Sequence, residues 1–136
     1  MKGKFITFEG CEGVGKSTQL KLLCEYLKEK KVDFIFTREP GGTVISEKIR
    51  GVILDKDNTE MTAECEALLY ASSRVQLLKE VILPALEQGK LVLCDRYCDS
   101  SFAYQAYARG LGEEFISKIN DYALKFGVPN LTVLLD

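Results

Sequence analysis

Short apolar runs alternate along this chain with longer stretches in which apolar residues recur every three or four positions. The runs at 4–9, 33–37, 91–94 and 131–135 are rich in β-branched, aromatic or other apolar residues, so each is expected to form a strand. The run at 91–94 is continuously apolar, as expected for a strand that is covered on both faces. Strands that alternate with helices are typical of a parallel sheet. We therefore predict an α/β fold in which helices cover both faces of the sheet.

The helices are expected between these strands. Apolar residues share one helical face over 20–27, and a short helix is predicted for 45–54. A long helical stretch is predicted for 62–86 with a bend at Pro84, and a further apolar stripe covers 115–126. Right-handed crossovers then bring the loops after the strands to one edge of the sheet. The chemistry is expected at that edge.

Size and composition narrow the range of functions. The 136 residues fit one domain, 1–136, and 46% hydrophobic residues are enough to build a core. The 18 Lys and Arg residues against 20 Asp and Glu residues give a formal charge of -2, which argues against a nucleic-acid partner or a membrane surface. The chain contains no histidine, so Ser-His catalysis, Cys-His catalysis and His-ligated zinc are excluded.

The cysteines and the N-terminal residues indicate a cellular compartment. The five cysteines are odd in number and form no CxxC pair, so reduced thiols in a cytoplasmic protein are expected. The N-terminal residues show no signal-like apolar stretch, and the longest charge-free run, 126–135, is too short to span a bilayer. A cytoplasmic location is therefore predicted.

The segment 10–17 matches the phosphate-binding pattern GxxxxGK[ST], with a predicted strand before it and a predicted helix after it. Glycines let backbone N–H groups converge on phosphate oxygens, Lys16 adds a positive charge, and Ser17 offers a hydroxyl to Mg²⁺. The alternative is an ordinary glycine-rich turn, but the strand, the spacing, the Lys-Ser pair and the helix occur together here. We predict binding of a nucleoside triphosphate. Glu12 should point away from its phosphates, towards a second ligand, because like charges repel.

Arginines follow two of the predicted strands and lie on the helices between them. Arg38 and Arg96 come after strands, whereas Arg50 and Arg74 lie within the intervening helices. Arginine grips phosphate in a planar, bidentate way, so this set suggests a second phosphorylated ligand beside the phosphate loop. A surface ion pair is the alternative for each, above all for Arg38, which adjoins Glu39, and for Arg50.

The segment 100–107 after Arg96 is polar and aromatic. Such a segment could stack on a base and form hydrogen bonds with its edge. The alternative is a half-buried helix that uses its tyrosines for packing.

Six blocks of the sequence resemble bacterial thymidylate kinase. They occupy residues 8–10, 11–18, 37–43, 95–101, 103–105 and 129–136. The resemblance extends over the whole chain, and the Arg-Glu-Pro-Gly-Gly and Asp-Arg-Tyr blocks are far more specific than the phosphate loop alone. It implies a P-loop, nucleoside-monophosphate-kinase-like parallel sheet. It also implies the ATP-dependent phosphorylation of dTMP to dTDP in nucleotide biosynthesis.

The resemblance also implies roles for individual residues. Lys16 and Ser17 would serve the ATP phosphates and Mg²⁺, and Asp95 would lie close to the metal ion. The residues implied in ATP binding are Gly10, Cys11, Glu12, Gly13, Val14, Gly15, Lys16, Ser17 and Thr18. Those implied in catalysis are Glu12, Lys16, Asp95 and Arg96. Those implied in binding dTMP are Glu12, Arg38, Glu39, Pro40, Arg50, Tyr70, Arg74, Arg96, Ser101, Tyr104 and Gln105.

Within that dTMP site the resemblance assigns separate parts of the ligand. Arg50 and Arg96 would hold the 5′-phosphate, and Glu12 would face the sugar 3′-hydroxyl. Tyr70 would stack on the thymine. The residues that would recognise the edge of the base are Arg74, Ser101, Tyr104 and Gln105. Family members also form homodimers through their helical faces, and the apolar content of 62–86 is compatible with that.

The expected mechanism needs no general base, because the acceptor is already a phosphate anion, so catalysis is positioning and neutralisation of charge. The variable positions of the phosphate loop carry no arginine, so the chain resembles family members with catalytic arginines in a mobile lid. The resemblance places that lid beyond Asp136. We therefore expect an N-terminal portion without the lid, the last strand and the last helix. The alternatives are another P-loop nucleotide or deoxynucleoside kinase, or a catalytically impaired nucleotide-binding fragment.

Overall fold

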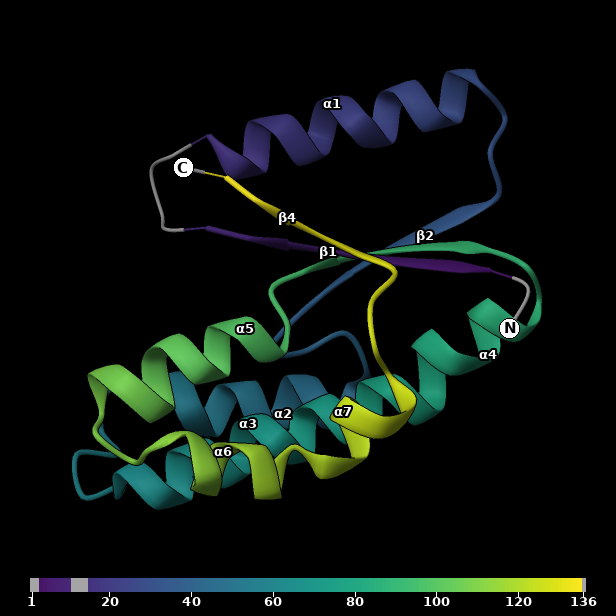
Figure 1. Cartoon of the computed structure of the whole chain (residues 1–136). Helices are drawn as coiled ribbons and strands as arrows, with labels where there is room; N and C mark the ends of the chain where they lie inside the picture. The colour runs from purple at the N-terminus through teal and green to yellow at the C-terminus, as the bar shows by residue number, and fades with distance from the viewer. Residues whose placement is uncertain (1–2, 11–14, 136) are drawn as a thin grey trace.

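Four parallel strands form a single sheet at the centre of the molecule (Figure 1). A computed structural model describes residues 3–10 and 15–135. The strands are β1 (Lys4–Glu9), β2 (Phe34–Arg38), β3 (Leu91–Asp95) and β4 (Leu131–Leu134), in the spatial order β2-β3-β1-β4. All three neighbouring pairs are parallel. The predicted α/β fold with a parallel sheet is confirmed, and every strand begins and ends within one residue of its predicted bounds.

Helices cover both faces of this sheet, as predicted. Helix α1 (Lys16–Glu29) lies along one face, and the other helices lie on the opposite side (Figure 1). Those helices are α2 (Val44–Leu54), α3 (Ala63–Leu77), α4 (Leu83–Glu87), α5 (Cys98–Ser101), α6 (Glu113–Ile119) and α7 (Asp121–Phe126). Two π-helical stretches, η1 (Leu78–Ile82) and η2 (Phe102–Ala108), continue α3 and α5. Among the described residues, no helix has both the length and the apolar character needed to cross a membrane.

Two predicted helices are divided in the structure. The stretch 62–86 changes to the π-helix η1 at residue 78, before the predicted bend at Pro84. Pro84 opens α4, where its missing N–H group matters least, and the wider π-helical turn precedes it. The stripe 115–126 divides at Asn120, whose side chain donates a hydrogen bond to the carbonyl of Ile116 (3.0 Å). Asparagine forms such local bonds readily, and this one ends α6.

Alternation along the strands builds a separate core on each face. Phe5, Val92 and Cys94 point to the face that α3, η1 and α4 cover, and all three are fully buried. Phe8 and Leu93 point to the other face, where they pack against Leu20 and Leu27 of α1. The alternation explains why 91–94 is continuously apolar: the strand is covered on both sides.

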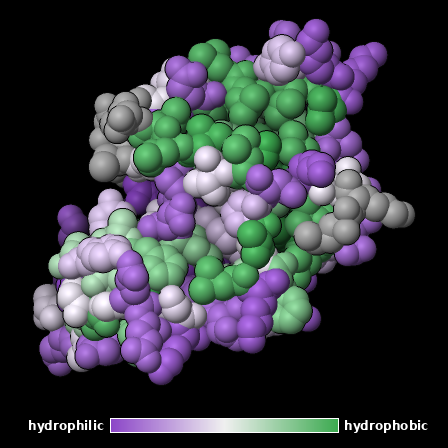
Figure 2. Space-filling view, in the orientation of Figure 1, coloured by the Kyte–Doolittle hydropathy of each residue, from purple (hydrophilic) through white to green (hydrophobic). Residues whose placement is uncertain are grey.

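Strand β4 forms one edge of the sheet and is less covered than the others. Leu131 is 53% exposed and Leu134 is 71% exposed. Figure 2 shows hydrophobic residues gathered on this side of the molecule, over β4 and beside α1. Two hydrogen bonds between Asn130 and Phe5 fix the start of the strand. The backbone N–H of Asn130 donates to the carbonyl of Phe5, and its side-chain oxygen accepts from the backbone N–H of Phe5, both at 2.7 Å.

Candidate active site

The carboxyl ends of β1, β2 and β3 meet at one edge of the sheet. Asp95 of β3 is in register with Phe8 of β1 on one side and with Arg38 of β2 on the other. The loops that follow are joined by backbone bonds, from the N–H of Arg96 to the carbonyl of Phe8 (2.8 Å) and from the N–H of Glu39 to the carbonyl of Asp95 (2.9 Å). Segments far apart in the sequence therefore form one continuous site.

The phosphate loop leaves β1 at this edge and returns into α1. Gly15 has φ 83° at the N-terminus of α1, a left-handed conformation that suits glycine. Gly10 is required for a different reason, because a Cβ there would lie 2.7 Å from the carbonyl oxygen of Leu135. The predicted ATP-binding residues Cys11, Glu12, Gly13 and Val14 lie outside the described residues, as do the catalytic and substrate-binding roles predicted for Glu12.

Lys16 and Asp95 face each other across the start of α1. The Lys16 Nζ lies 2.7 Å from the Asp95 Oδ1 and 3.5 Å from the carbonyl oxygen of Gly10. The lysine is buried, whereas Ser17 and Thr18 are exposed in the first turn of the helix. This set fits a nucleoside triphosphate with Mg²⁺, because the helix N-terminus and Lys16 favour phosphate, and hydroxyl and carboxylate oxygens are ligands that Mg²⁺ prefers.

Residues 3–10 and 15–135 hold no cluster of three or more His, Cys, Asp or Glu side chains suited to a metal ion. The described cysteines are free thiols, and burial raises the pKa of Cys98 to about 11. Buried, protonated thiols of this kind pack as small apolar groups.

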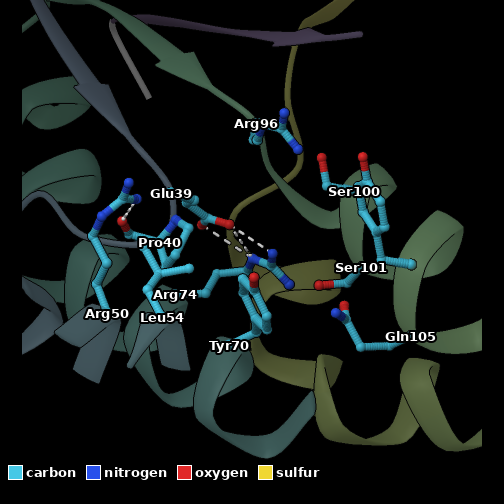
Figure 3. Close-up of a pocket in the computed structure, with 11 residues that line it drawn as sticks. Glu39, Pro40, Arg50, Leu54, Tyr70, Arg74, Arg96, Ser100, Ser101 and Gln105 are labelled. Carbon is cyan, nitrogen blue, oxygen red and sulfur yellow. Dashed lines mark hydrogen bonds and ion pairs between the residues drawn. The ribbon is translucent and has the colours of Figure 1, made fainter. Parts of the chain in front are cut away.

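A cavity of about 310 Å³ lies under the ends of β2 and β3 (Figure 3). Its walls come from the loops after these strands and from α2, α3, α5 and η2. The lining residues are Glu39, Pro40, Arg50, Leu54, Tyr70, Arg74, Arg96, Ser100, Ser101, Tyr104 and Gln105. Nine of them were predicted to bind the substrate; Leu54 and Ser100 were not.

Two arginines reach this cavity from different sides (Figure 3). Arg50 comes from α2 and donates from Nη1 to the carbonyl of Pro40 (2.9 Å). Arg96 comes from the loop after β3, and its guanidinium lies 5.9 Å from the centre of the Tyr104 ring. Two guanidinium groups from different elements therefore line the cavity.

The far wall of the cavity combines an aromatic ring with small polar groups. Tyr70 of α3 is half-buried there, and burial raises the pKa of its hydroxyl, so the group is neutral at physiological pH. Ser101 and Gln105 are each 3% exposed and carry their polar groups towards the cavity (Figure 3). An aromatic face beside an amide and a hydroxyl can hold a planar, hydrogen-bonding ligand.

Arg74 forms the floor of the cavity and is 2% exposed. Its Nε donates to Glu39 at 2.7 and 3.0 Å, and its Nη2 lies 2.6 Å from Glu39 Oε1. Further bonds run to the side-chain oxygen of Asn120 and to the carbonyl of Tyr97 (3.2 Å). Burial raises the pKa of Glu39, and the neighbouring Arg74 opposes that rise. The two charges thus compensate each other inside the protein.

Asn120 was not predicted, although it is 3% exposed and contacts Arg74 directly. The available signal was an asparagine in the middle of a predicted helical stripe, where that residue type is unfavourable.

Arg38 does not line the cavity. It is exposed, and its Nη2 donates to Glu47 Oε1 at 3.0 Å, which is the surface ion pair considered as the alternative for this residue. Its predicted role in substrate binding stays a prediction.

The comparisons with known proteins all point to the same family. A family model described as thymidylate kinase matches residues 8–136. The thymidylate kinase of Clostridium novyi (strain NT) is 54% identical over 135 residues, covering 99% of this chain and 66% of its own length. That of Acholeplasma laidlawii (strain PG-8A) is 58% identical over 132 residues, covering 97% of this chain and 64% of its own.

A solved structure agrees with these relatives. The crystal structure of thymidylate kinase from Ehrlichia chaffeensis superposes with a TM-score of 0.88 at 37% identity, over 100% of this chain and 72% of that one. The chain spans slightly less than two thirds of the length of the two curated relatives. Because the family model matches nearly the whole chain, the chain belongs to the thymidylate kinase family.

Proposed function

We propose that the protein transfers the γ-phosphoryl group of ATP to dTMP, giving dTDP, with Mg²⁺ as cofactor. The observation that carries the proposal is the adjacency of Asp95 and Arg96. Asp95 pairs with Lys16 of the phosphate loop, while Arg96 lines the neighbouring cavity. Consecutive residues thus link a donor-phosphate site to an acceptor cavity, and phosphoryl transfer requires the two ligands in line and close together.

The chemistry of the cavity suits dTMP as the acceptor. Arg50 and Arg96 would hold its 5′-phosphate, and Tyr70 would stack on the base. Ser101 and Gln105 offer hydrogen-bonding groups for the edge of the thymine. The volume of about 310 Å³ lies at the small end of the usual range of ligand pockets, which suits one mononucleotide.

The chain's own residues then act by position and charge. Lys16 neutralises the donor phosphates, and Arg96 neutralises the acceptor, so that two anions can approach each other. Mg²⁺, when bound, would further neutralise the charge of the transferring group, and Ser17 and Asp95 would be the residues that hold it. The acceptor phosphate attacks as an anion, so no side chain has to remove a proton.

We also infer that the protein acts in the cytoplasm as a homodimer, without a nucleic-acid or membrane partner. The nearly balanced charge and free thiols support that location. The exposed Val44 and Ile45 of α2 and Leu68 of α3 offer apolar surface for a second copy. The mass in solution, measured by light scattering, tests the dimer.

The choice of acceptor tests the main proposal. ADP formation is measured with dTMP, dCMP, AMP and thymidine at equal concentrations. We expect dTMP to exceed the others by about 100-fold or more, because a site built to bond specific polar groups rejects ligands that leave them unpaired. Phosphorylation of thymidine without phosphorylation of dTMP would show that the proposal is wrong.

A further inference from the structure

Glu9 is a buried carboxylate at the last position of β1, directly before the phosphate loop. It is 6% exposed. Its Oε2 accepts a hydrogen bond from the backbone N–H of Tyr97 at 2.9 Å, and its Oε1 accepts one from the hydroxyl of Ser100. Both partners belong to the segment that follows β3, 88 and 91 residues further along the chain. Glu9 therefore joins the donor side of the site to the acceptor side.

The position is unfavourable for a carboxylate in other respects. Burial raises the pKa of Glu9, the two hydrogen bonds lower it, and the neighbouring carboxylates of Asp99 and Glu39 raise it. An uncharged side chain would avoid the cost of burying a charge. What the carboxylate provides here is two acceptor oxygens at a fixed reach from the strand.

The backbone on both sides of the Arg96 Cα is hydrogen-bonded to the end of β1. Its φ is 71°, a left-handed conformation that is uncommon for residues other than glycine. The N–H of Arg96 itself bonds to the carbonyl of Phe8, and the next N–H along the chain, that of Tyr97, bonds to Glu9. The two peptide groups on either side of the Arg96 Cα are thus both anchored to the end of β1. This double anchor sets the direction in which the arginine side chain leaves the backbone.

We propose that Glu9 is a positioning residue that orients Arg96 towards the 5′-phosphate of the acceptor. The inference rests on the proposed function. Glu9, in the strand directly before the phosphate loop, would fix the backbone conformation of Arg96 through its hydrogen bond to Tyr97. The end of β1 would then support both the phosphate loop and the arginine that binds the acceptor. A loss of this support should weaken the grip on the phosphate and leave the base and sugar contacts in place.

Two conservative variants distinguish the effect of the length of the Glu9 side chain from the effect of its charge. Glu9→Asp keeps the charge but is one methylene too short to meet Tyr97, whereas Glu9→Gln keeps the reach and an acceptor oxygen but loses the charge. Calorimetry gives the affinity of each variant for dTMP and for thymidine, which lacks the phosphate. For Glu9→Asp we expect about a tenfold loss for dTMP, as one charge-assisted hydrogen bond is impaired, and less than about a twofold change for thymidine. Glu9→Gln should keep the ratio of the two affinities within about threefold of the unmodified protein.

Three results would overturn the inference. A loss in Glu9→Gln with normal binding in Glu9→Asp would assign Glu9 an electrostatic role. An equal loss for dTMP and thymidine would indicate general damage to the site, and normal ratios in both variants would show that Glu9 does not orient Arg96.

Folding is checked first by circular dichroism and urea unfolding. If Glu9→Asp does not fold, Ser100→Ala takes its place, because it removes one of the two ties from the other end. It should lower dTMP affinity selectively, and an unchanged ratio would again overturn the inference. A different result would show that the proposed function itself is wrong: the unmodified protein would then bind dTMP no more tightly than thymidine.

Discussion

Lys16 forms an ion pair with Asp95 at the start of α1. The side chain of Lys16 is 8% exposed and that of Asp95 is 25% exposed, so the pair is partly shielded from water. An ammonium group suited to phosphate and a carboxylate suited to a metal ion are thus paired with each other at the end of β3.

Replacement of this lysine tests the division between donor and acceptor sites. We expect Lys16→Ala to lower ATP-dependent turnover by about 100-fold or more, because a charge that stabilises the transition state is lost. The affinity for dTMP, measured by calorimetry without ATP, should stay within about twofold, since Lys16 does not line the acceptor cavity.

Lys28→Ala is the matched control, because Lys28 is an exposed lysine in the last turn of the same helix. It should leave both ATP use and dTMP binding unchanged. Equal turnover in Lys16→Ala and Lys28→Ala would contradict the assigned role of Lys16.

Single residues differed in how far the sequence could place them. Arg50 and Tyr70 were expected from the family resemblance, and Gln105 from one of its sequence blocks. The fold brings all three into one cavity. Asn120 and Glu9 act through hydrogen bonds to residues 46 or more positions away, and no local pattern encodes such partners. For Arg38 the sequence suggested a role in substrate binding, but the structure pairs it with Glu47 at the surface. That partner could not be predicted, because it depends on where α2 begins.

At the scale of elements, the start of α2 holds the loop that follows β2. Thr43 caps the helix by accepting a hydrogen bond from the N–H of Ser46 (2.9 Å). Glu47, in the first turn, accepts one from the N–H of Gly42 (2.7 Å) and one from Arg38. The bond from Gly42, followed by the charge of Arg38, lowers the pKa of Glu47. The helix therefore fixes the glycine-rich turn beside the acceptor cavity.

This arrangement predicts a stability difference that depends on pH. The pKa of Glu47 is lower in the folded chain than in the unfolded chain, so its contribution is present above the unfolded value of about 4.3 and is lost as the pH falls through the folded value. We expect Glu47→Gln to lower the melting temperature by about 2 °C at pH 7, because the carboxylate is exposed and its bonds are weak. The difference should shrink as the pH falls below the unfolded value and then through the lower folded pKa, as followed by circular dichroism.

Glu114→Gln serves as the comparison, since it removes a surface ion pair with Lys118 that involves no backbone N–H. Its effect at pH 7 should be smaller than that of Glu47→Gln. A deficit in Glu47→Gln that is the same at pH 7 and pH 3 would rule out this account.

Elements were predictable where one rule dominates. Short runs of β-branched, aromatic or other apolar residues predicted all four strands, and the glycine-rich pattern predicted the start of α1. The π-helix η1 was not predictable, because apolar periodicity over 62–86 fits a continuous helix with a bend at Pro84 equally well. Leu78 and Ile82 of η1 are fully buried in the core, and such tertiary contacts are not contained in the periodicity.

At the scale of the whole molecule, Arg74 joins four separate parts of the chain. It belongs to α3 and bonds to Glu39 after β2, to Tyr97 after β3 and to Asn120 between α6 and α7. These parts form the side of the sheet opposite α1 (Figure 1). One guanidinium group thus ties together most of the layer that encloses the acceptor cavity.

Removal of this group should destabilise the fold as a whole. We expect Arg74→Met to lower the free energy of unfolding by about 3–5 kcal/mol, because it leaves the Glu39 carboxylate buried without its partner. The double variant Arg74→Met with Glu39→Met should lose less than the single variant, since no unpaired charge remains. Urea unfolding measures both, and a double variant at least as unstable as Arg74→Met would contradict this explanation.

The fixation of Arg74 also bears on which ligands the cavity can accept. A free arginine side chain carries about 2 kcal/mol of rotamer entropy, and here that freedom is given up when the chain folds, not when a ligand binds. The floor of the cavity therefore behaves as a rigid template. A larger base that required Arg74 to move would have to break its bonds to Glu39, Tyr97 and Asn120 together. We therefore expect a larger base to bind poorly, because moving Arg74 would disrupt contacts throughout the helical layer.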